Sequence, residues 1–263
     1  MKISFIGAGN VAWHMAQALD RNKHQVIEVF SRNLKNSKSL VEKLYNAHAV
    51  ETLDFSESKS EIFVICVPDD ALTSILHQTV FPSNCIVVHT SGSLSLEALS
   101  MISHLKTGVF YPLQTFSKSK QVIFKNIPIC IEAINKETEA ILEKLAFSIC
   151  ENVCFYSSED RKILHLAAVI ACNFTNHMLT ISKKILEKEN MDFAVLKPLI
   201  QETFEKALLN GPEKSQTGPA VRKDIKTITE HLHLLEKTPL TKEIYKNLTS
   251  SIQDSGINLK SYV

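Results

Sequence analysis

Residues 2–12 of the chain read KISFIGAGNVA, an apolar run followed at once by two glycines and an alanine at fixed spacing. The run Lys2 to Ile6 predicts a buried strand, and Asn10 to Arg21 predicts a helix that begins directly after the glycines. Gly7 permits a tight turn, Gly9 lets the backbone approach a phosphate, and Ala12 lets the helix pack against the strand. The free N–H groups of the first helical turn attract a pyrophosphate, so the pattern is typical of a dinucleotide-binding turn, with a plain strand-to-helix turn as the alternative. The candidate cofactor contacts in this turn are Gly7, Ala8, Gly9, Asn10, Val11 and Ala12.

Short apolar runs alternate with amphipathic segments over the first part of the chain, as in repeated βαβ units. The expected strands are Lys2 to Ile6, Gln25 to Phe30, Glu61 to Cys66, Cys85 to His89, Gly108 to Tyr111, Ile127 to Ile131 and Val153 to Tyr156. The clearest expected helices are Asn10 to Arg21, Asn33 to Tyr45, Asp69 to Val80 and Lys136 to Ile149. Because some of these strands are apolar throughout, helices should cover both faces of the sheet. The sequence therefore predicts an α/β fold with a doubly wound, Rossmann-type parallel sheet.

The pattern changes after Tyr156, because no convincing strand follows and the apolar spacing is helical from there on. Helices are expected at Ser158 to Glu189, Asp192 to Leu209, Val221 to Leu235 and Thr241 to Ser250. We predict a dinucleotide-binding domain over residues 1–157 and a second, all-helical domain over residues 158–263. The helix around Ala167 to Ile181 would expose much apolar surface in a monomer, which predicts a homodimer formed through the helical domain.

The residues that follow the second expected strand distinguish between dinucleotides. NAD-binding proteins usually have an acidic residue there, which accepts a hydrogen bond from the ribose 2′-OH. This chain has Ser31 and Arg32 instead. A guanidinium forms charge-assisted hydrogen bonds with phosphate oxygens, so these two residues favour the 2′-phosphate of NADP. The alternative is that Arg32 is a solvated loop residue.

Residues that directly follow other strands are further candidates, because ligands of open parallel sheets lie beyond the carboxyl ends of the strands. Tyr111 ends one such strand and is a candidate substrate contact. His89 has a second interpretation as a hydrogen-bonded histidine at the end of a buried strand, and Asp69 is expected to cap a helix. The candidate cofactor contacts in these turns are Val67, Pro68, His89, Ser91 and Gly92.

Polar side chains also recur at helical spacing within the long apolar segment that opens the second domain. His165 can donate a proton, Asn173 can orient a carbonyl or imine, and Lys162 is another proton source. The alternative is that this polar face binds a neighbouring helix or a second subunit. Arg222, in a Gly-Pro loop, either holds a substrate carboxylate or pairs with Asp224. The candidate catalytic residues are thus His165, Asn173 and Lys162, and the candidate substrate contacts are Tyr111, Asn176 and Arg222.

Composition argues against several classes of function. The net charge of +1 gives no field that would attract nucleic acid or an anionic membrane. The apolar run Ile62 to Val67 is too short for a membrane span, and Met1 leads directly into a strand rather than a signal peptide. The six cysteines lie mostly in apolar stretches without metal-ligand spacing. We therefore expect a cytoplasmic protein with reduced core thiols and no metal.

Several segments together resemble a bacterial family that joins a Rossmann-like NADP-binding domain to a helical domain of unknown function. They are MKISFIGAGNVA, the pair Ser31-Arg32, VPDDAL, HTSGSLS, FYPLQTF, the stretch from His165 to Asn176, and TGPAVRKD. The N-terminal half is also similar to pyrroline-5-carboxylate reductase, ketopantoate reductase and deazaflavin-dependent NADP reductases, which implies a reductase ancestry. Lys162 and Asn173 match the reaction-centre Lys and Asn of the β-hydroxyacid dehydrogenases only loosely, and the helical segment lacks the Ser/Thr-rich glycine stretch of the pyrroline-5-carboxylate reductases.

The leading hypothesis is an NADP-dependent oxidoreductase that acts on a small carbonyl or imine in an interdomain cleft. The main alternative is a non-catalytic NADP(H)-binding sensor or assembly protein, because fold alone does not establish activity. A methyl- or phosphate-transfer enzyme that uses the same turn for another nucleotide is a weaker third interpretation.

Overall fold

The computed structural model describes residues 1–254, and these fall into two compact units. The first unit is Met1–Asn173 and the second begins at Phe174. The division therefore lies inside the long helical segment Ser158–Lys188, later in the chain than the domain boundary expected from the sequence. The first part of this helix belongs with the sheet because the Arg161 side chain is buried against Glu132 and Leu94 of that unit.

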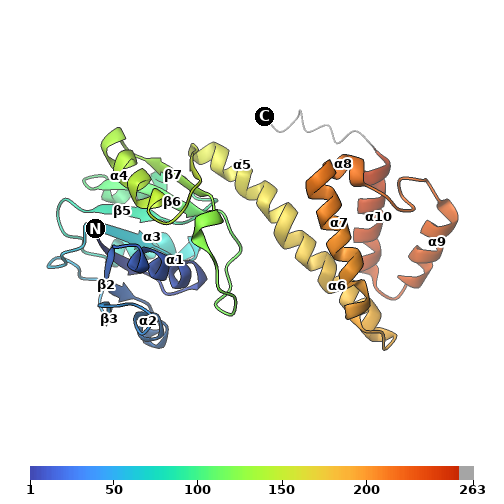
Figure 1. Ribbon diagram of the computed structural model, residues 1–263, viewed down its shortest axis with the longest axis horizontal. Coiled ribbons are helices and arrows are strands. Elements are labelled where there is room, and N and C mark those ends of the chain that lie inside the picture. The colour runs from blue at the N-terminus through green and yellow to red at the C-terminus, as the bar shows by residue number, and fades with distance from the viewer. Residues whose placement is uncertain (255–263) are drawn as a thin grey trace. The chain divides into compact units, whose positions relative to one another are not determined.

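The first unit is built on an eight-stranded sheet with the order β3-β2-β1-β4-β5-β6-β7-β8 (Figure 1). The strands are β1 Lys2–Ile6, β2 Gln25–Phe30, β3 His48–Val50, β4 Ile62–Ile65, β5 Ile86–His89, β6 Lys106–Pro112, β7 Ile129–Ala133 and β8 Val153–Phe155. The first six strands in this sheet order, from β3 through β1 to β6, are parallel, which confirms the Rossmann-type prediction. However, β7 is antiparallel to β6 and parallel to β8, so the sheet is mixed at this edge.

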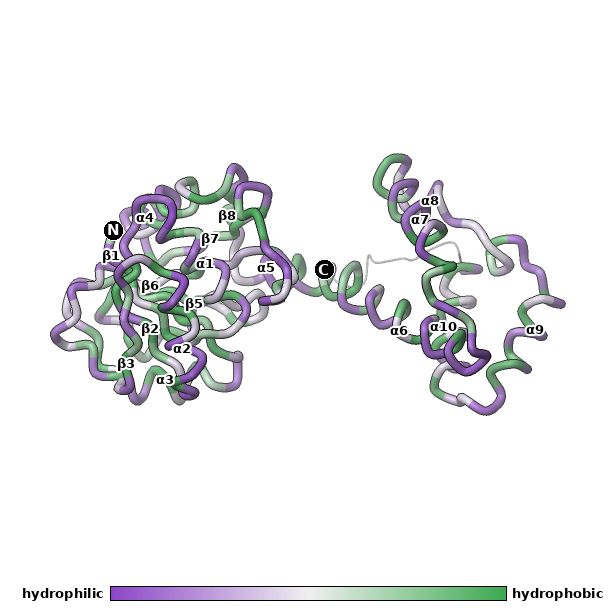
Figure 2. The backbone as a smooth tube through the Cα atoms, turned by 60° about the horizontal axis from the view of Figure 1, so that its bottom comes forward, coloured by the Kyte–Doolittle hydropathy of each residue, from purple (hydrophilic) through white to green (hydrophobic). Residues whose placement is uncertain are grey.

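Helices cover both faces of the sheet, as the doubly wound prediction requires. Alternate side chains of β1, β4 and β5 join two separate apolar cores, because successive residues of a strand point to opposite faces. Figure 2 shows hydrophobic residues along the central strands of this unit. Helices α1 (Asn10–Arg21), α2 (Leu34–Val41) and α4 (Lys136–Phe147) contribute to one core. Helix α3 (Leu72–Gln78) and the 3₁₀ helix η2 (Leu96–Ile102) contribute to the other.

Two expected helices have other bounds in the structure and one strand was not expected, each for an identifiable reason. Helix α2 ends at Val41, because the chain turns there and the Tyr45 N–H donates to Asp20 Oδ2 at 2.8 Å. The strand β3 was not expected, since three residues give too little pattern to recognise. Helix α9 (Ile225–Leu234) begins after Lys223, whose positive φ of 53° interrupts the helical path.

Shorter helical turns connect the sheet elements. Asp69–Ala71 forms the 3₁₀ turn η1 before α3, and Phe124–Asn126 forms η3 before β7. Asp69 is not a helix cap, because Pro68 occupies that position and Asp69 instead accepts a hydrogen bond from Ser93 Oγ. This contact joins the segments that follow β4 and β5.

The long helix contains an irregular turn. It consists of α5 (Ser158–Ala168), the π-helical segment η4 (Val169–Phe174) and α6 (Thr175–Lys188). A π-helical turn is wider than an α-helical turn and shifts all later residues around the axis. Helical spacing across η4 therefore does not identify which residues share a face, so the common face of His165 and Asn176 stays a prediction.

The long helix also has the length and the apolar composition that a membrane span needs. Ser158–Lys188 is long enough to cross a membrane, and it contains an 18-residue apolar window with a mean hydropathy of 1.2, so it qualifies by length and composition alone. None of that apolar window is buried within the structure.

The second unit is helical throughout its described residues. After α6 it contains η5 (Phe193–Leu196), α7 (Lys197–Asn210), α8 (Pro212–Ser215), α9 and α10 (Pro239–Gln253). Pro212 and Pro239 begin α8 and α10, where a missing N–H costs no helical hydrogen bond.

Candidate active site

The glycine turn between β1 and α1 has the geometry that a phosphate-binding turn needs. The N–H of Gly7 donates to the Phe30 carbonyl at 2.8 Å, and Gly7 has a φ of +111°. A Cβ at this position would lie 2.2 Å from the Cys66 carbonyl oxygen, so only glycine fits. A Cβ at Gly9 would meet nothing within 4 Å, and no side chain caps the helix there. The first N–H groups of α1 are thus available to an anion.

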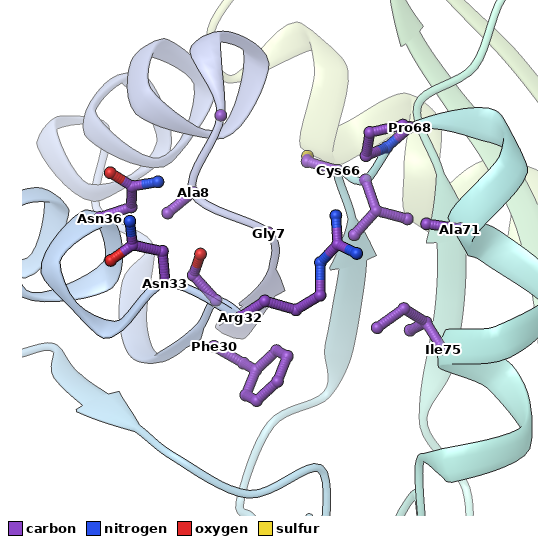
Figure 3. Close-up of a pocket in the computed structure, with 13 residues that line it drawn as sticks. Gly7, Ala8, Phe30, Arg32, Asn33, Asn36, Cys66, Pro68, Ala71 and Ile75 are labelled. Atoms are coloured by element: carbon purple, nitrogen blue, oxygen red, sulfur yellow. The ribbon is translucent and has the colours of Figure 1, made fainter.

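A cavity of about 190 Å³ opens beside this turn (Figure 3). Its lining includes the expected residues Gly7, Ala8, Gly9, Ser31, Arg32, Val67 and Pro68. Phe30 and Ile75 supply apolar walls, and the guanidinium of Arg32 lies toward Ala71 and Pro68. Among the described residues no carboxylate is within ion-pair distance of Arg32. A free guanidinium beside an open helix N-terminus fits a phosphorylated nucleotide.

Two of the polar residues that line this cavity were not predicted from the sequence as site residues. Asn33 and Asn36 line it on the side opposite the Arg32 guanidinium (Figure 3). The side-chain Oδ1 of Asn33 accepts from the Lys35 N–H at 3.1 Å and so caps α2. Their place at the start of the helix after β2 was the available signal, because that helix end faces the same cavity as Arg32.

Asn10, Val11 and Ala12 do not line the cavity themselves. The Asn10 amide donates to the Phe116 carbonyl at 3.0 Å, which fastens the segment between β6 and β7 to the start of α1. One turn later, His14 Nε2 contacts the Ser117 carbonyl at 2.9 Å. Ala12 is buried in the core. The side chains of this turn therefore support its shape, while its backbone faces the cavity.

The segment after β5 is organised around a buried histidine. His89 is 2% exposed; its Nδ1 accepts from the Ser91 N–H and its Nε2 donates to the Ser95 carbonyl, both at 3.2 Å. Burial, helped by the nearby Arg161 charge, lowers the pKa of His89 to about 4. A neutral imidazole that binds only its own loop is structural, so the second interpretation of His89 is the one the geometry supports. Ser91 likewise binds inside the loop, where its Oγ accepts from the Leu94 N–H at 3.0 Å.

A second polar group forms where this loop, the end of β6 and α5 meet. Tyr111 Oη lies 3.2 Å from His165 Nδ1, and the two rings are nearly perpendicular with centroids 6.1 Å apart. A Cβ on Gly92 would lie 2.7 Å from His165 Nδ1 and 2.8 Å from Tyr111 Cζ. The close approach of the two rings therefore requires glycine at position 92. Three residues predicted separately as catalytic, substrate-binding and cofactor-binding thus lie together.

The other predicted catalytic and substrate residues lie outside this group. Lys162 is exposed on α5, and Asn173 is exposed in the π-helical segment. Asn176 on α6 and Arg222 before α9 are exposed residues of the second unit. Arg222 does not pair with Asp224, whose carboxylate instead caps α9 by accepting from the Thr227 N–H at 3.1 Å.

The cysteines and acidic residues add no metal centre within residues 1–254. No group of three or more His, Cys, Asp or Glu side chains there is placed to hold a metal ion. Cys85, Cys130 and Cys150 are buried free thiols, as expected, whereas Cys172 is exposed on the long helix. Burial raises the pKa of Cys130 to about 12.

A mostly parallel, doubly wound sheet with a glycine turn and a basic cavity at its carboxyl edge defines a dinucleotide-binding protein. Comparison with known families makes the assignment specific. Residues 2–91 match the family described as NADP oxidoreductase coenzyme F420-dependent, and residues 127–252 match a domain of unknown function, DUF2520.

Solved structures give the same result over nearly the whole chain. A Bacteroides fragilis protein named as an NADP oxidoreductase is 37% identical, with a TM-score of 0.87 over 96% of this chain and 98% of that one. The chain therefore belongs to this family of two-domain NADP oxidoreductases, and NADP is the family's cofactor. No curated protein sequence is significantly similar to it.

More distant structures share the fold alone. A reductive aminase from Aspergillus terreus, in complex with NADPH and ethyl-5-oxohexanoate, is 14% identical. Its TM-score is 0.73 over 97% of this chain and 93% of that one. The 1-pyrroline-5-carboxylate reductase of Streptococcus pyogenes is 16% identical, with a TM-score of 0.62 over 97% and 98% of the two chains.

Proposed function

We propose that the protein is an NADPH-dependent reductase of a small carbonyl or imine compound, with His165 as the proton donor. The observation that carries this proposal is the Tyr111–His165 pair at the carboxyl end of β6. Ligands of open α/β sheets bind beyond this edge. The reductive aminase with a similar fold is named with a keto ester, and another similar structure is named as an imine reductase, which supports this substrate class.

The residues of this chain have separable roles in the proposed reaction. The turn at Gly7 and Gly9 and the guanidinium of Arg32 bind the phosphates of the dinucleotide. When bound, NADPH supplies the hydride. In the proposed arrangement the Tyr111 hydroxyl donates a hydrogen bond to His165 Nδ1, so that the ring N–H is on Nε2. As the Nε2 proton passes to the oxygen or nitrogen of the reduced bond, Nδ1 takes the Tyr111 proton, and the Tyr111 phenolate is reprotonated from water.

Other residues complete the proposal. Asn173 is proposed to orient the substrate and Lys162 to serve as a second proton source, because both are exposed on the helix that carries His165. The substrate contacts Asn176 and Arg222 stay predictions.

The test compares His165→Ala with the unchanged protein and with His104→Ala, which removes an exposed histidine elsewhere in the first unit. NADPH consumption is followed with ethyl 5-oxohexanoate, cyclohexanone plus allylamine, and a panel of aldehydes and keto acids. We expect His165→Ala to lower turnover by about 10² to 10⁴ while NADPH affinity stays nearly constant. Equal turnover in the two variants would remove His165 from the mechanism. NADPH binding without turnover of any substrate would favour a non-catalytic sensor.

We also propose that a second copy of the chain covers the long helix. Four apolar side chains of this helix, Ile163, Leu166, Ile170 and Phe174, are 62%, 58%, 54% and 56% exposed. So many exposed apolar side chains on one helix are unusual on a monomer. Sedimentation of the purified protein should give a dimer, and Leu166→Asp should weaken it. A monomer at micromolar concentration, or a need for detergent to keep the protein in solution, would contradict this proposal.

A further inference from the structure

Arg161, on the first turns of α5, is a charged side chain that is only 1% exposed. Its Nη1 donates to Glu132 Oε2 on β7, and its Nη2 donates to the Leu94 carbonyl in the loop after β5. Ser158 completes the cluster, because its hydroxyl donates to Glu132 at 2.8 Å and accepts from the Leu96 N–H at 2.9 Å. A single guanidinium thus connects a helix, a strand and a loop.

Such a buried ion pair is a poor means of simply holding a helix in place. Removing the Arg161 charge from water, and most of the Glu132 side chain, which is 20% exposed, costs free energy that apolar side chains of similar size do not lose. The other ion pairs of the described chain have at least one partner that is clearly exposed to solvent. Arg161 differs from them in that its fork-shaped guanidinium fixes direction as well as distance. The arrangement is suited to setting one register of α5 against the sheet.

The pairing of β6 with β7 shows that the alignment of α5 against the sheet also sets the distance between His165 and Tyr111. Glu132 pairs with Val109, and Cys130 pairs with Tyr111, across the antiparallel strands β6 and β7. Glu132 and Tyr111 are therefore diagonal neighbours on one face of the sheet, roughly 7–8 Å apart between backbones. Arg161 and His165 are one turn apart on one side of α5, because residues four apart face the same way. The helix contacts Glu132 through the first residue and Tyr111 through the second.

The loop after β5 is held by the same cluster. Its Leu94 carbonyl and Leu96 N–H bind Arg161 and Ser158, while Gly92 lies against the His165 ring. Because a Cβ on Gly92 would come within 2.7 Å of His165 Nδ1, a small shift of the loop would displace the imidazole. The loop after β5 and the strand β7 are thus both bound to the Arg161 guanidinium beside His165.

We propose that Arg161 is a positioning residue for the reaction: by binding Glu132 and the Leu94 carbonyl it aligns α5 and the loop, and so holds His165 against Tyr111 and Gly92. The assignment of a role in turnover rests on the proposed function of His165. The effect on the position of the His165 ring does not depend on that function.

The test uses a double variant in which Arg161→Met is combined with Glu132→Leu, so that no unpaired charge stays buried and the chain can fold. Arg161→Lys is the second variant, because an ammonium keeps the charge without the planar fork. Lys106→Met is the matched control, since it breaks an exposed ion pair with Glu137 in the same unit. Thermal unfolding, NADPH affinity and turnover are measured for each protein, and nuclear Overhauser contacts between the Tyr111 and His165 rings are recorded.

Positioning predicts that the double variant and Arg161→Lys lose the ring contacts and about 10²-fold in kcat, while NADPH affinity stays within about twofold. The control should keep both the contacts and kcat. Ring contacts and kcat that persist in both Arg161 variants would overturn the proposal and leave Arg161 a purely structural group. If the unchanged protein reduces no carbonyl or imine, the proposed function fails, and the ring contacts alone decide whether Arg161 positions His165.

Discussion

The selectivity for NADP over NAD should depend on Arg32. Replacing Arg32 by Ala removes the guanidinium that lies over the cavity beside the glycine turn and leaves the turn itself unchanged (Figure 3). A hydrogen bond between charged groups contributes about 1.5–3 kcal/mol. Because Arg32 is exposed and its charge is screened by water, the lower part of this range applies, about 1.5–2 kcal/mol. This corresponds to a loss of about 10- to 30-fold in NADPH affinity.

Isothermal titration calorimetry with NADPH and NADH measures this effect directly. NADH has no 2′-phosphate, so its affinity should be the same for Arg32→Ala and the unchanged protein. Lys35→Ala is the control, because it removes an equal charge from an exposed position nearby that does not line the cavity. The loss for NADPH should also shrink at high salt, since exposed charges are screened. If Arg32→Ala weakened both nucleotides equally, or neither, the assignment of Arg32 to the 2′-phosphate would be wrong.

Three further predictions concern the turn, the ring pair and the buried histidine. Gly9→Ala should abolish NADPH binding with little loss of thermal stability, because its Cβ enters open space. Gly7→Ala should lower both NADPH affinity and thermal stability, because its Cβ would lie 2.2 Å from the Cys66 carbonyl oxygen. Equal melting temperatures of the two variants would contradict this reasoning. Gly92→Ala should reduce turnover about 10- to 100-fold at constant NADPH affinity, because it displaces the His165 ring, and steady-state kinetics would show this. The pKa of His89 falls to about 4 in the folded protein, so the unfolded chain binds its proton first as the pH falls below about 6.5. Stability from this group is complete above that pH and is lost between about 6.5 and 4. Urea unfolding should show a loss of about 2 kcal/mol at pH 5 that is absent in His89→Gln, and an identical pH dependence in both proteins would refute the assignment.

The glycine turn could be predicted from the sequence because its requirements are local. Gly7 and Gly9 are demanded by backbone conformation and by the close approach of a phosphate, and an apolar strand precedes them directly. The same holds for Ser31 and Arg32, whose place at the end of β2 follows from counting along one βα unit. Position along the chain was sufficient to predict that the glycine turn and Arg32 lie beside one cavity.

Strand direction and contacts between residues far apart in the chain could not be predicted from the apolar pattern of the sequence. The antiparallel direction of β7 follows from how β6 and β7 pair, and either direction leaves the apolar pattern unchanged. The role of Asp69 was assigned to a helix cap because its partner Ser93 follows a different strand. Nothing near Arg161 in the sequence shows that it would be buried and paired with Glu132.

The sequence by itself determined the class of cofactor, because a glycine turn and a basic strand end bind phosphates through groups only a few residues apart. Only the tertiary structure decided which polar residues meet at the proposed reaction centre, because Tyr111 and His165 are 54 residues apart and come together through the pairing of strands and the alignment of α5. Contacts between such distant residues depend on the register of whole elements, and the apolar pattern of a single segment does not specify that register.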